Sequence, residues 1–353
     1  MTPLQDLLEK AVGTGNVPGA AAVVARGDEV EIGSAGDVEP DSIVRIASIT
    51  KPITAAAVML LVDEGSVAFD DPIARWLPEL DSPRVVRTPE SPLDDVVPAA
   101  RPIAVEDVLT SRAGWGFPSD FSLPAVTELF EKLPVFGPQE TPDEWLATLA
   151  KVPMLRHPGD AWLYNTCSDI QGTLIARVSG RPLPEFLAER VFGPLGMTDT
   201  GFHVPEGKLD RLPARHGSDV MPIDERLWRE PPIFPSGAGG LVSTLADLHR
   251  FGRMLLAAGG GLLSRESVSL MMTDHLTQEQ RDDSRLFLEG AGWGFGGAVA
   301  ADGRYGWVGG TGTTAHVAPS TGTVGVLLTQ LQMTGPTPTP LMREFWRYAF
   351  GAS

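Results

Sequence analysis

Residues 46–65 read IASITKPITAAAVMLLVDEG and are the most informative stretch of the chain. Apolar residues recur in this stretch at the three- and four-residue spacing of a helix with a buried face. Pro52 is tolerated in the first turn of a helix, and Gly65 is a common residue at a helix end. We therefore predict a helix that begins close to Ser48 and ends at Gly65.

Ser48 and Lys51 form a Ser-x-x-Lys pair at the start of this predicted helix. Residues three apart lie on the same side of a helical turn, so the lysine amine can approach the serine hydroxyl. A serine hydroxyl attacks a carbonyl carbon when a base takes its proton, and burial beside the positive end of a helix favours a neutral amine. The same helix end would stabilise negative charge on the attacked oxygen. The spacing alone equally fits a helix-capping serine beside a surface lysine.

Composition limits the class of protein. The 353 residues, 42% hydrophobic and 21% charged, are typical of a soluble globular chain with one large domain or two interleaved ones. A net charge of −17 repels phosphate groups, so we expect no nucleic-acid partner. The longest apolar run, residues 53–62, is too short to span a membrane, and we expect no membrane partner.

Cysteine and histidine content gives no sign of disulfides or metal. The single cysteine, Cys167, cannot form an internal disulfide. The six histidines lack the spacing of zinc ligands, so we predict no metal and no cofactor. The first residues carry acid rather than the basic and then apolar layout of a secretory signal, and we expect a cytoplasmic protein. No pattern in the sequence predicts the oligomeric state.

Both ends of the chain carry strand patterns. Residues 19–25 and 29–32, joined by a turn, indicate a β-hairpin. Near the other end, strand-like runs separated by glycine-rich turns indicate an antiparallel meander; they are residues 298–300, 305–308, 314–318 and 324–328. Helical patterns at residues 3–12 and 340–350 lie outside these strands.

These patterns predict an α/β protein of the α+β type. A mainly antiparallel sheet flanked by helices would be built from residues 1–65 and 235–353. Residues 66–234 would form a mainly helical domain with long loops, with Ser48 in the cleft between the two. The proline-rich stretch 81–102 is interpreted as an exposed excursion.

Five motifs, of which the first contains the Ser48–Lys51 pair, follow one another along nearly the whole chain. They are DSIVRIASITKPIT (residues 41–54), PGDAWLYNT (158–166), VFGPLGMTDT (191–200), PSGAGGLVSTLADL (235–248) and WVGGTG (307–312). In this order they resemble the serine hydrolases related to class C β-lactamases, which include penicillin-binding-protein-like carboxylesterases, D-amino-acid peptidases and acyltransferases. The resemblance implies a β-lactamase/transpeptidase-like fold and an acyl-enzyme formed on Ser48, with Lys51 as its base.

The tyrosine motif of that family matches at Tyr164, which the resemblance makes a second proton carrier. The family motif is commonly Tyr-x-Asn, whereas here Asn165 follows the tyrosine directly and Thr166 takes the third position. Either Asn165 or Thr166 is therefore expected to support the site. A core tyrosine with a bonded hydroxyl is the alternative interpretation of Tyr164.

Trp307 stands where β-lactam-processing relatives place a lysine or a histidine that helps to bind the substrate carboxylate. A tryptophan there resembles the esterase branch, since an apolar wall suits a neutral ester better than an anion. Ordinary packing in a strand is the alternative for Trp307. After it, Gly309 and Gly310 let the backbone approach a substrate, and the resemblance makes the Gly310 N–H a partner of the Ser48 N–H in an oxyanion hole.

The sequence therefore predicts a serine hydrolase that acts through an acyl-enzyme on a small-molecule ester or amide, with carboxylic esters as its substrates. A β-lactamase, a D-amino-acid peptidase or an acyltransferase of the same fold is the first alternative, and a catalytically inactive ligand-binding member is the second. No Gly-x-Ser-x-Gly occurs, so the α/β-hydrolase elbow is excluded. The glycines at 237–240 do not follow a strand in the dinucleotide-binding form.

Overall fold

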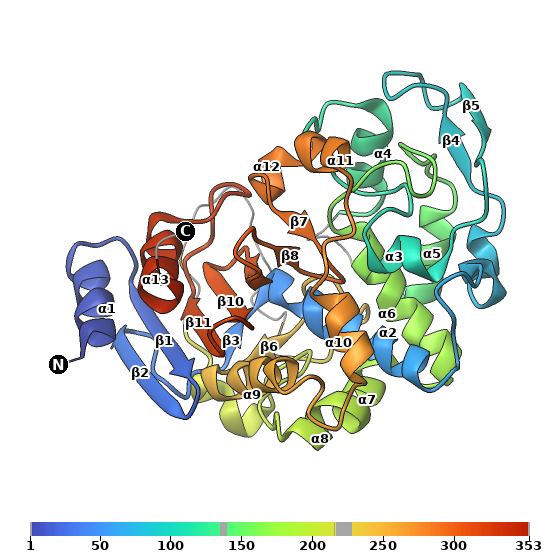
Figure 1. Cartoon of the computed structure of the whole chain (residues 1–353). Coiled ribbons are helices and arrows are strands. Elements are labelled where there is room, and N and C mark those ends of the chain that lie inside the picture. Colours follow the sequence, from blue (N-terminus) through green and yellow to red (C-terminus); the bar gives the residue numbers. More distant parts are fainter. Residues whose placement is uncertain (1, 135–139, 215, 217–227, 352–353) are drawn as a thin grey trace.

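Strands from both ends of the chain meet in one sheet (Figure 1). The computed structural model describes residues 2–134, 140–214, 216 and 228–351. The 7-stranded sheet is antiparallel throughout, in the order β2-β1-β11-β10-β9-β8-β7. Its strands are β1 (Gly19–Arg26), β2 (Glu29–Gly36), β7 (Gly292–Trp293), β8 (Ala298–Val299), β9 (Tyr305–Gly309), β10 (Thr313–Ala318) and β11 (Thr323–Thr329). The predicted hairpin, meander and mainly antiparallel fold class are confirmed.

The first strand of the hairpin lies inside the sheet because its side chains are small and apolar. Val23 of β1 pairs with Ile32 of β2 on one side and with Val326 of β11 on the other. All residues of β1 except Arg26 are buried. A strand covered on both faces carries a continuous apolar run, which is why this segment does not alternate.

Helices from distant parts of the sequence cover the two faces of the sheet and build the rest of the molecule (Figure 1). They are α1 (Pro3–Gly13), α2 (Thr50–Asp63), α3 (Val105–Leu109), α4 (Pro124–Lys132), α5 (Pro142–Leu149), α6 (Thr166–Ser179), α7 (Leu183–Leu187), α8 (Gly193–Leu195), α9 (Leu245–Leu256), α10 (Arg265–Met271), α11 (Gln278–Asp283), α12 (Arg285–Leu288) and α13 (Pro340–Phe350). The helices predicted at residues 3–12 and 340–350 correspond to α1 and α13.

Two neighbouring residues of β11 show that α9 and α13 lie on opposite faces of the sheet. Successive residues of a strand point to opposite faces. A Cβ atom added to Gly252 of α9 would meet Val324, whereas one added to Gly325 would meet Phe350 of α13. The glycines therefore allow a helix to approach the sheet closely on each side.

The structure corrects the interpretation of residues 81–102 as an exposed excursion. β4 (Arg84–Val86) and β5 (Val96–Pro98) form a small hairpin there. Val85 and Val86 are buried in the main hydrophobic core, and the Val86 N–H donates to the Met154 carbonyl at 3.0 Å. The prolines shorten these strands without preventing burial of the two valines between them.

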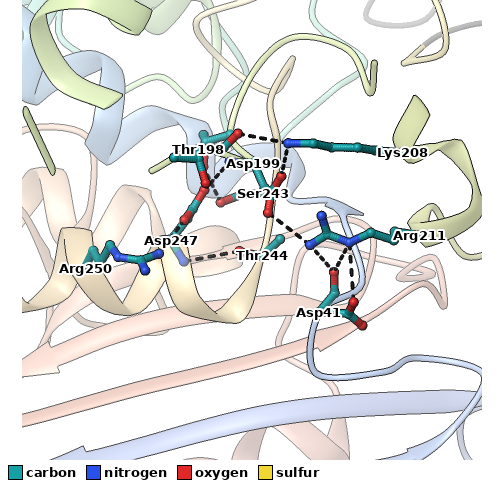
Figure 2. A network of polar contacts seen from close by, with 10 residues as sticks. Asp41, Thr198, Asp199, Lys208, Arg211, Ser243, Thr244, Asp247 and Arg250 are labelled. Atoms are coloured by element: carbon teal, nitrogen blue, oxygen red, sulfur yellow. Dashed lines mark hydrogen bonds and ion pairs between the residues drawn. The ribbon is translucent and has the colours of Figure 1, made fainter. Parts of the chain in front are cut away.

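Asp247 in the first turn of α9 ties the loop at residues 199–200 to that helix (Figure 2). Its carboxylate accepts hydrogen bonds from the Asp199 N–H at 2.8 Å and from the Thr200 hydroxyl at 2.9 Å, and it pairs with Arg250. Thr244 caps the same helix end by accepting from the Asp247 N–H. The loop after α8 is thereby held on α9, close to β6 (Val242–Ser243), which pairs with β3 (Val44–Arg45) just before Ser48.

No helix in the described part of the chain is long and apolar enough to cross a bilayer. The division into a sheet domain of residues 1–65 and 235–353 and a helical domain of residues 66–234 stays a prediction, and residues 135–139, 215 and 217–227 of the latter lie outside the described residues.

Candidate active site

Ser48 lies in a short turn directly before α2. Residues Ala47–Ile49 form a single 3-10 turn, and α2 begins at Thr50. The backbone of Ala47 is in the left-handed region, with φ 45°, and the Thr50 hydroxyl donates to the Ala47 carbonyl at 2.7 Å. The helix predicted around Ser48 is thus present, but the serine precedes its first α-helical turn. A left-handed backbone at a residue other than glycine costs conformational free energy, and such residues cluster at functional sites.

Lys51 is the best-connected side chain around Ser48. Its Nζ lies 3.0 Å from Ser48 Oγ, 2.9 Å from Asn165 Oδ1 and 2.6 Å from the Ala238 carbonyl oxygen. The residue is only 1% exposed, whereas Ser48 is partly exposed. Three segments far apart in the sequence therefore converge on one buried amine, and the surface-lysine interpretation of Lys51 is wrong.

Asn165 reaches Lys51 through an unusual turn. Its φ of 82° and ψ of −65° are those of the strained form of a three-residue γ-turn. In agreement, the Thr166 N–H donates to the Tyr164 carbonyl at 3.2 Å. This turn brings the residue directly after the tyrosine to the lysine, while Thr166 becomes the first residue of α6. Of the two candidates for the supporting role, the structure places Asn165 against Lys51.

Tyr164 presents its ring to Lys51 and its hydroxyl to Trp307. The Lys51 Nζ lies 4.6 Å from the centroid of the Tyr164 ring. The Tyr164 oxygen accepts a hydrogen bond from Trp307 Nε1 at 2.8 Å. Phe287 of α12 stacks on the phenol ring, with a centroid distance of 4.7 Å. The indole and the second aromatic ring hold the phenol beside the lysine.

The end of β9 lies directly against the serine turn. A Cβ atom on Gly309 would stand 2.3 Å from the Ile46 carbonyl oxygen, so only glycine allows this approach. Thr313 of β10 fastens the same contact, because its hydroxyl donates to the Ile46 carbonyl at 3.2 Å. Gly310 follows in an exposed position with open space where its Cβ would be. Trp307, Gly309 and Gly310 therefore all belong to the segment that adjoins Ser48.

Two residues around Lys51 were missed by the sequence analysis. The glycine-rich stretch at 237–240 was excluded as a dinucleotide site, yet the Ala238 carbonyl makes the shortest contact of Lys51. Asp169 of α6 accepts hydrogen bonds from the Ser236 hydroxyl at 2.7 Å and from the Ala238 N–H at 3.1 Å. Burial raises the pKa of the Asp169 carboxyl, while these hydrogen bonds and the charge of Lys51 act in the opposite direction. The one sequence signal is an acidic residue, the only one on α6, among the mostly small and apolar residues of its first turns.

Cys167 lies two residues before Asp169 on α6 and is buried. Its thiol is not suited to nucleophilic chemistry. Burial raises the pKa of its thiol to about 12, so the reactive thiolate is not formed near neutral pH. Among the residues that the structure describes, no group of three or more histidine, cysteine, aspartate or glutamate side chains is arranged to hold a metal ion.

Comparison with known proteins agrees with this architecture. The Beta-lactamase family model matches residues 4–343. Protein Rv1367c of Mycobacterium tuberculosis is 39% identical over 321 residues, which cover 83% of this chain and 78% of that protein. Esterase EstB of Burkholderia gladioli is 29% identical over 328 residues, with the same two coverages of 83% and 78%.

A solved structure shows the same fold. The structure of EstCE1, a hydrolase with promiscuous acyltransferase activity, superimposes with a TM-score of 0.84 at 22% identity and covers 99% of this chain and 97% of its own. The predicted β-lactamase/transpeptidase-like fold is therefore confirmed. Because the family model spans nearly the whole sequence, the chain belongs to the β-lactamase family.

Proposed function

We propose that the protein is a carboxylesterase that forms an acyl-enzyme on Ser48. The observation that carries the proposal is the position of the Lys51 amine, 3.0 Å from Ser48 Oγ and fixed by two carbonyl oxygens. A neutral amine has two N–H bonds and one lone pair. When the two N–H groups donate to Asn165 and Ala238, the lone pair is left for the serine hydroxyl, which is the arrangement a general base needs.

Acylation would begin with transfer of the Ser48 proton to Lys51 as Oγ bonds to the ester carbonyl carbon. Collapse of the tetrahedral intermediate breaks the bond between that carbon and the alcohol oxygen. The proton passes to the departing oxygen, directly from Lys51 or through the Tyr164 hydroxyl, and the alcohol leaves. Water then gives a proton to the amine and attacks the acyl carbon, and Ser48 departs with the returned proton. The sum is ester plus water giving acid plus alcohol.

The negative oxygen of the intermediate would be held by the backbone N–H groups of Ser48 and Gly310. Support comes from the contact of Gly309 with Ile46, which brings the end of β9 to the serine turn. The Gly309 carbonyl accepts from the Gly312 N–H at 3.0 Å, and the N–H of Gly310, in the same trans peptide, points the opposite way. Two backbone donors in fixed positions are the usual means of stabilising such an oxyanion.

A neutral ester is favoured over an anionic β-lactam by the environment of Trp307. Its indole N–H is already used by the Tyr164 oxygen, and its ring packs edge-on against Trp293 at 4.8 Å. This side chain offers no positive charge to a substrate carboxylate. A relative named as an esterase supports the same substrate class. An alcohol that replaces water in the second step would make the protein an acyltransferase with the same residues.

The proposal is tested by hydrolysis of p-nitrophenyl acetate, butyrate and octanoate, with the β-lactam nitrocefin measured alongside. We expect turnover of the short esters by the wild type and loss of at least about 1,000-fold in Ser48→Ala, because the nucleophile is removed. Ser269→Ala, an exposed serine of α10, serves as the matched control and keeps wild-type rates.

Two results would contradict the proposal. Ester turnover by Ser48→Ala at the wild-type rate would remove Ser48 from the mechanism. Nitrocefin turnover faster than that of every ester would assign the protein to β-lactam hydrolysis instead. A fluorophosphonate probe that labels the wild type but not Ser48→Ala identifies the nucleophile independently of the substrate chosen.

A further inference from the structure

We propose that Asp169 is a positioning residue for Lys51, acting through the turn of residues 236–238 and as a buried counter-charge to the ammonium that forms when Lys51 takes the Ser48 proton. This inference rests on the proposed function, in which Lys51 is the base. Asp169 does not touch Ser48 and has no part in the proton transfers described above. Its effect on the reaction is exerted through the backbone segment that it shares with Lys51 and through its charge.

The shared segment is held from both sides by hydrogen bonds. On one side the Asp169 carboxylate accepts from the Ser236 hydroxyl at 2.7 Å and from the Ala238 N–H at 3.1 Å. On the other side the Ala238 carbonyl accepts from Lys51 Nζ at 2.6 Å. One residue, Ala238, thus connects the carboxylate to the amine by its N–H and its C=O. A change at Asp169 moves the carbonyl that sets the position of the amine.

The turn packs closely between two helices, so a shift at the Asp169 carboxylate is passed on to the Ala238 carbonyl. A Cβ atom on Gly237 would lie 2.4 Å from the Ser168 carbonyl oxygen, so the backbone of the turn lies directly on α6. The Gly237 carbonyl in turn accepts from the Thr54 hydroxyl of α2 at 2.9 Å. The turn is therefore clamped between α6, which carries Asp169, and α2, which carries Lys51.

The donors around Asp169 fit an ionised carboxylate. A charged carboxylate only accepts hydrogen bonds, and both a hydroxyl and a backbone N–H point at Asp169. Other buried aspartates have a direct basic partner: Asp107 pairs with Arg101 and Asp247 with Arg250. Within the described residues, no lysine or arginine lies in ion-pair contact with Asp169. Lys51, on the far side of Ala238, is the cation whose charge acts on it.

Within the described residues, the titratable side chains shown beside the Lys51 amine are Tyr164 and Asp169. Tyr164 lies before α6 and presents its ring, and Asp169 lies on α6 behind the turn. Asp169 is the carboxyl group of the two, so the charge beside the lysine amine changes when this carboxyl titrates. The Lys51 methylene next to the amine is therefore a reporter of the Asp169 carboxylate.

The test uses NMR of protein labelled with [13Cε]lysine, which yields few signals because the chain has five lysines, namely Lys10, Lys51, Lys132, Lys151 and Lys208. The Lys51 signal is assigned by its absence in Lys51→Met. In the wild type we expect this signal to shift with an inflection above the ordinary aspartate range, because burial raises the pKa of Asp169. In Asp169→Asn the inflection disappears, because no carboxyl group remains to titrate.

Asp247→Asn is the matched control. Asp247 is also buried and bonded to backbone and hydroxyl donors, but it belongs to the network on α9 and not to the turn at Lys51 (Figure 2). The acid inflection of the Lys51 signal persists in this variant. A Lys51 signal without an inflection in the folded wild type, or with the same inflection in Asp169→Asn, overturns the proposal.

Kinetics supply a second readout, and a milder variant is used in case Asp169→Asn does not fold. Ser236→Ala removes one donor to the carboxylate at a partly exposed position. We expect kcat for a short ester to fall about 10-fold in Ser236→Ala and further in Asp169→Asn, with KM within twofold, because the base is displaced rather than the substrate site. An unchanged kcat in folded Ser236→Ala overturns the positioning role.

The NMR readout separates this proposal from the function on which it rests. If the protein hydrolyses no ester but the inflection is lost in Asp169→Asn, the proposed function fails and the coupling of Asp169 to Lys51 stands. If Ser48-dependent hydrolysis is present but the inflection is not, the function stands and this inference fails.

Discussion

Among single residues, Trp307 shows how an uncharged aromatic side chain takes part in the candidate site. Its N–H donates to the Tyr164 oxygen at 2.8 Å, and its ring contacts both Tyr164 and Trp293. The indole therefore fixes the phenol instead of offering charge to a substrate. Packing in the strand, the alternative interpretation of this residue, is also present, since Trp307 is buried.

Trp307→Phe should lower kcat for a short ester about 10-fold and leave KM within twofold. Phenylalanine keeps an aromatic ring at the site but removes the N–H donor, and one hydrogen bond is worth about 1 to 1.5 kcal/mol, or about tenfold in rate. Trp293→Phe is the control, because the buried Trp293 Nε1 has no hydrogen-bond partner within the described residues. Steady-state kinetics of the two variants decide the matter. Equal kcat values for Trp307→Phe and the wild type would show that the hydrogen bond does not serve catalysis.

Asn165 illustrates a residue whose role in the site could not be decided from the sequence. The deviation from Tyr-x-Asn left Asn165 and Thr166 as equal candidates for the supporting role. What decides between them is the φ of 82° at Asn165. This backbone turn lets an asparagine directly after the tyrosine reach Lys51, whereas the family motif has the asparagine two residues after the tyrosine. Such a conformation is imposed by surrounding contacts and leaves no pattern in the sequence.

Among helices and strands, those with long apolar patterns were predictable, whereas most of the short ones were not; β8 is the exception, because it lies within the predicted meander. The hairpin of β1 and β2, the meander and α13 follow from spacing that reflects burial on one or two faces. Strands of two residues, such as β3, β6 and β7, carry no periodicity at all. The hairpin of β4 and β5 was missed because its prolines are typical of loops, although Val85 and Val86 are buried.

The first turn of α9 provides a prediction about stability rather than activity. Asp247→Asn should lower the free energy of unfolding by about 1 to 3 kcal/mol, because it weakens charge-assisted hydrogen bonds to the loop at residues 199–200 and the pair with Arg250. Urea unfolding measures this loss, and Asp282→Asn on α11 is an exposed control. Ester turnover by folded Asp247→Asn should equal that of the wild type. A variant as stable as the wild type would show that this network does not hold the loop.

For the molecule as a whole, His316 links stability to pH. It is buried on β10, bonded through Nδ1 to the Thr314 hydroxyl at 2.9 Å and packed edge-on against Trp346. Burial, together with the nearby Arg304 guanidinium, lowers the pKa of His316 well below its ordinary value. In the unfolded chain His316 therefore binds a proton as the pH falls through about 6.5, whereas in the folded protein it stays neutral at that pH. The contribution of His316 to stability is complete above that pH and is lost as the pH falls below it.

Urea unfolding of the wild type and His316→Gln at pH 7.5, 6.5 and 5.5 tests this linkage. Between pH 6.5 and 5.5 the wild type should lose about 1 kcal/mol more than the variant, because one bound proton corresponds to about 1.4 kcal/mol per pH unit. His157→Gln, at a partly exposed loop position, should retain the pH dependence of the wild type. Parallel curves for the wild type and His316→Gln would contradict the assignment.

The site as a whole was predictable only in part, because some of its residues come together through contacts between segments far apart in the sequence. Ser48, Lys51, Tyr164 and the glycines after Trp307 stand out as motifs, and the fold brings their segments together. Asp169 belongs to no motif recognised from the sequence, and Ala238 lies in the motif of residues 235–248 without any sign there of its contact with Lys51. Their role depends on contacts between residues 69 positions apart. Such contacts become visible only when α2, α6 and the turn at 236–238 are placed in space.

The most direct test of the acyl-enzyme is mass spectrometry of protein quenched with acid during turnover of p-nitrophenyl butyrate. The account predicts a butyryl group on the peptide that contains Ser48, present in the wild type and absent in Ser48→Ala. A butyryl group on another residue, or full turnover by Ser48→Ala, would contradict it.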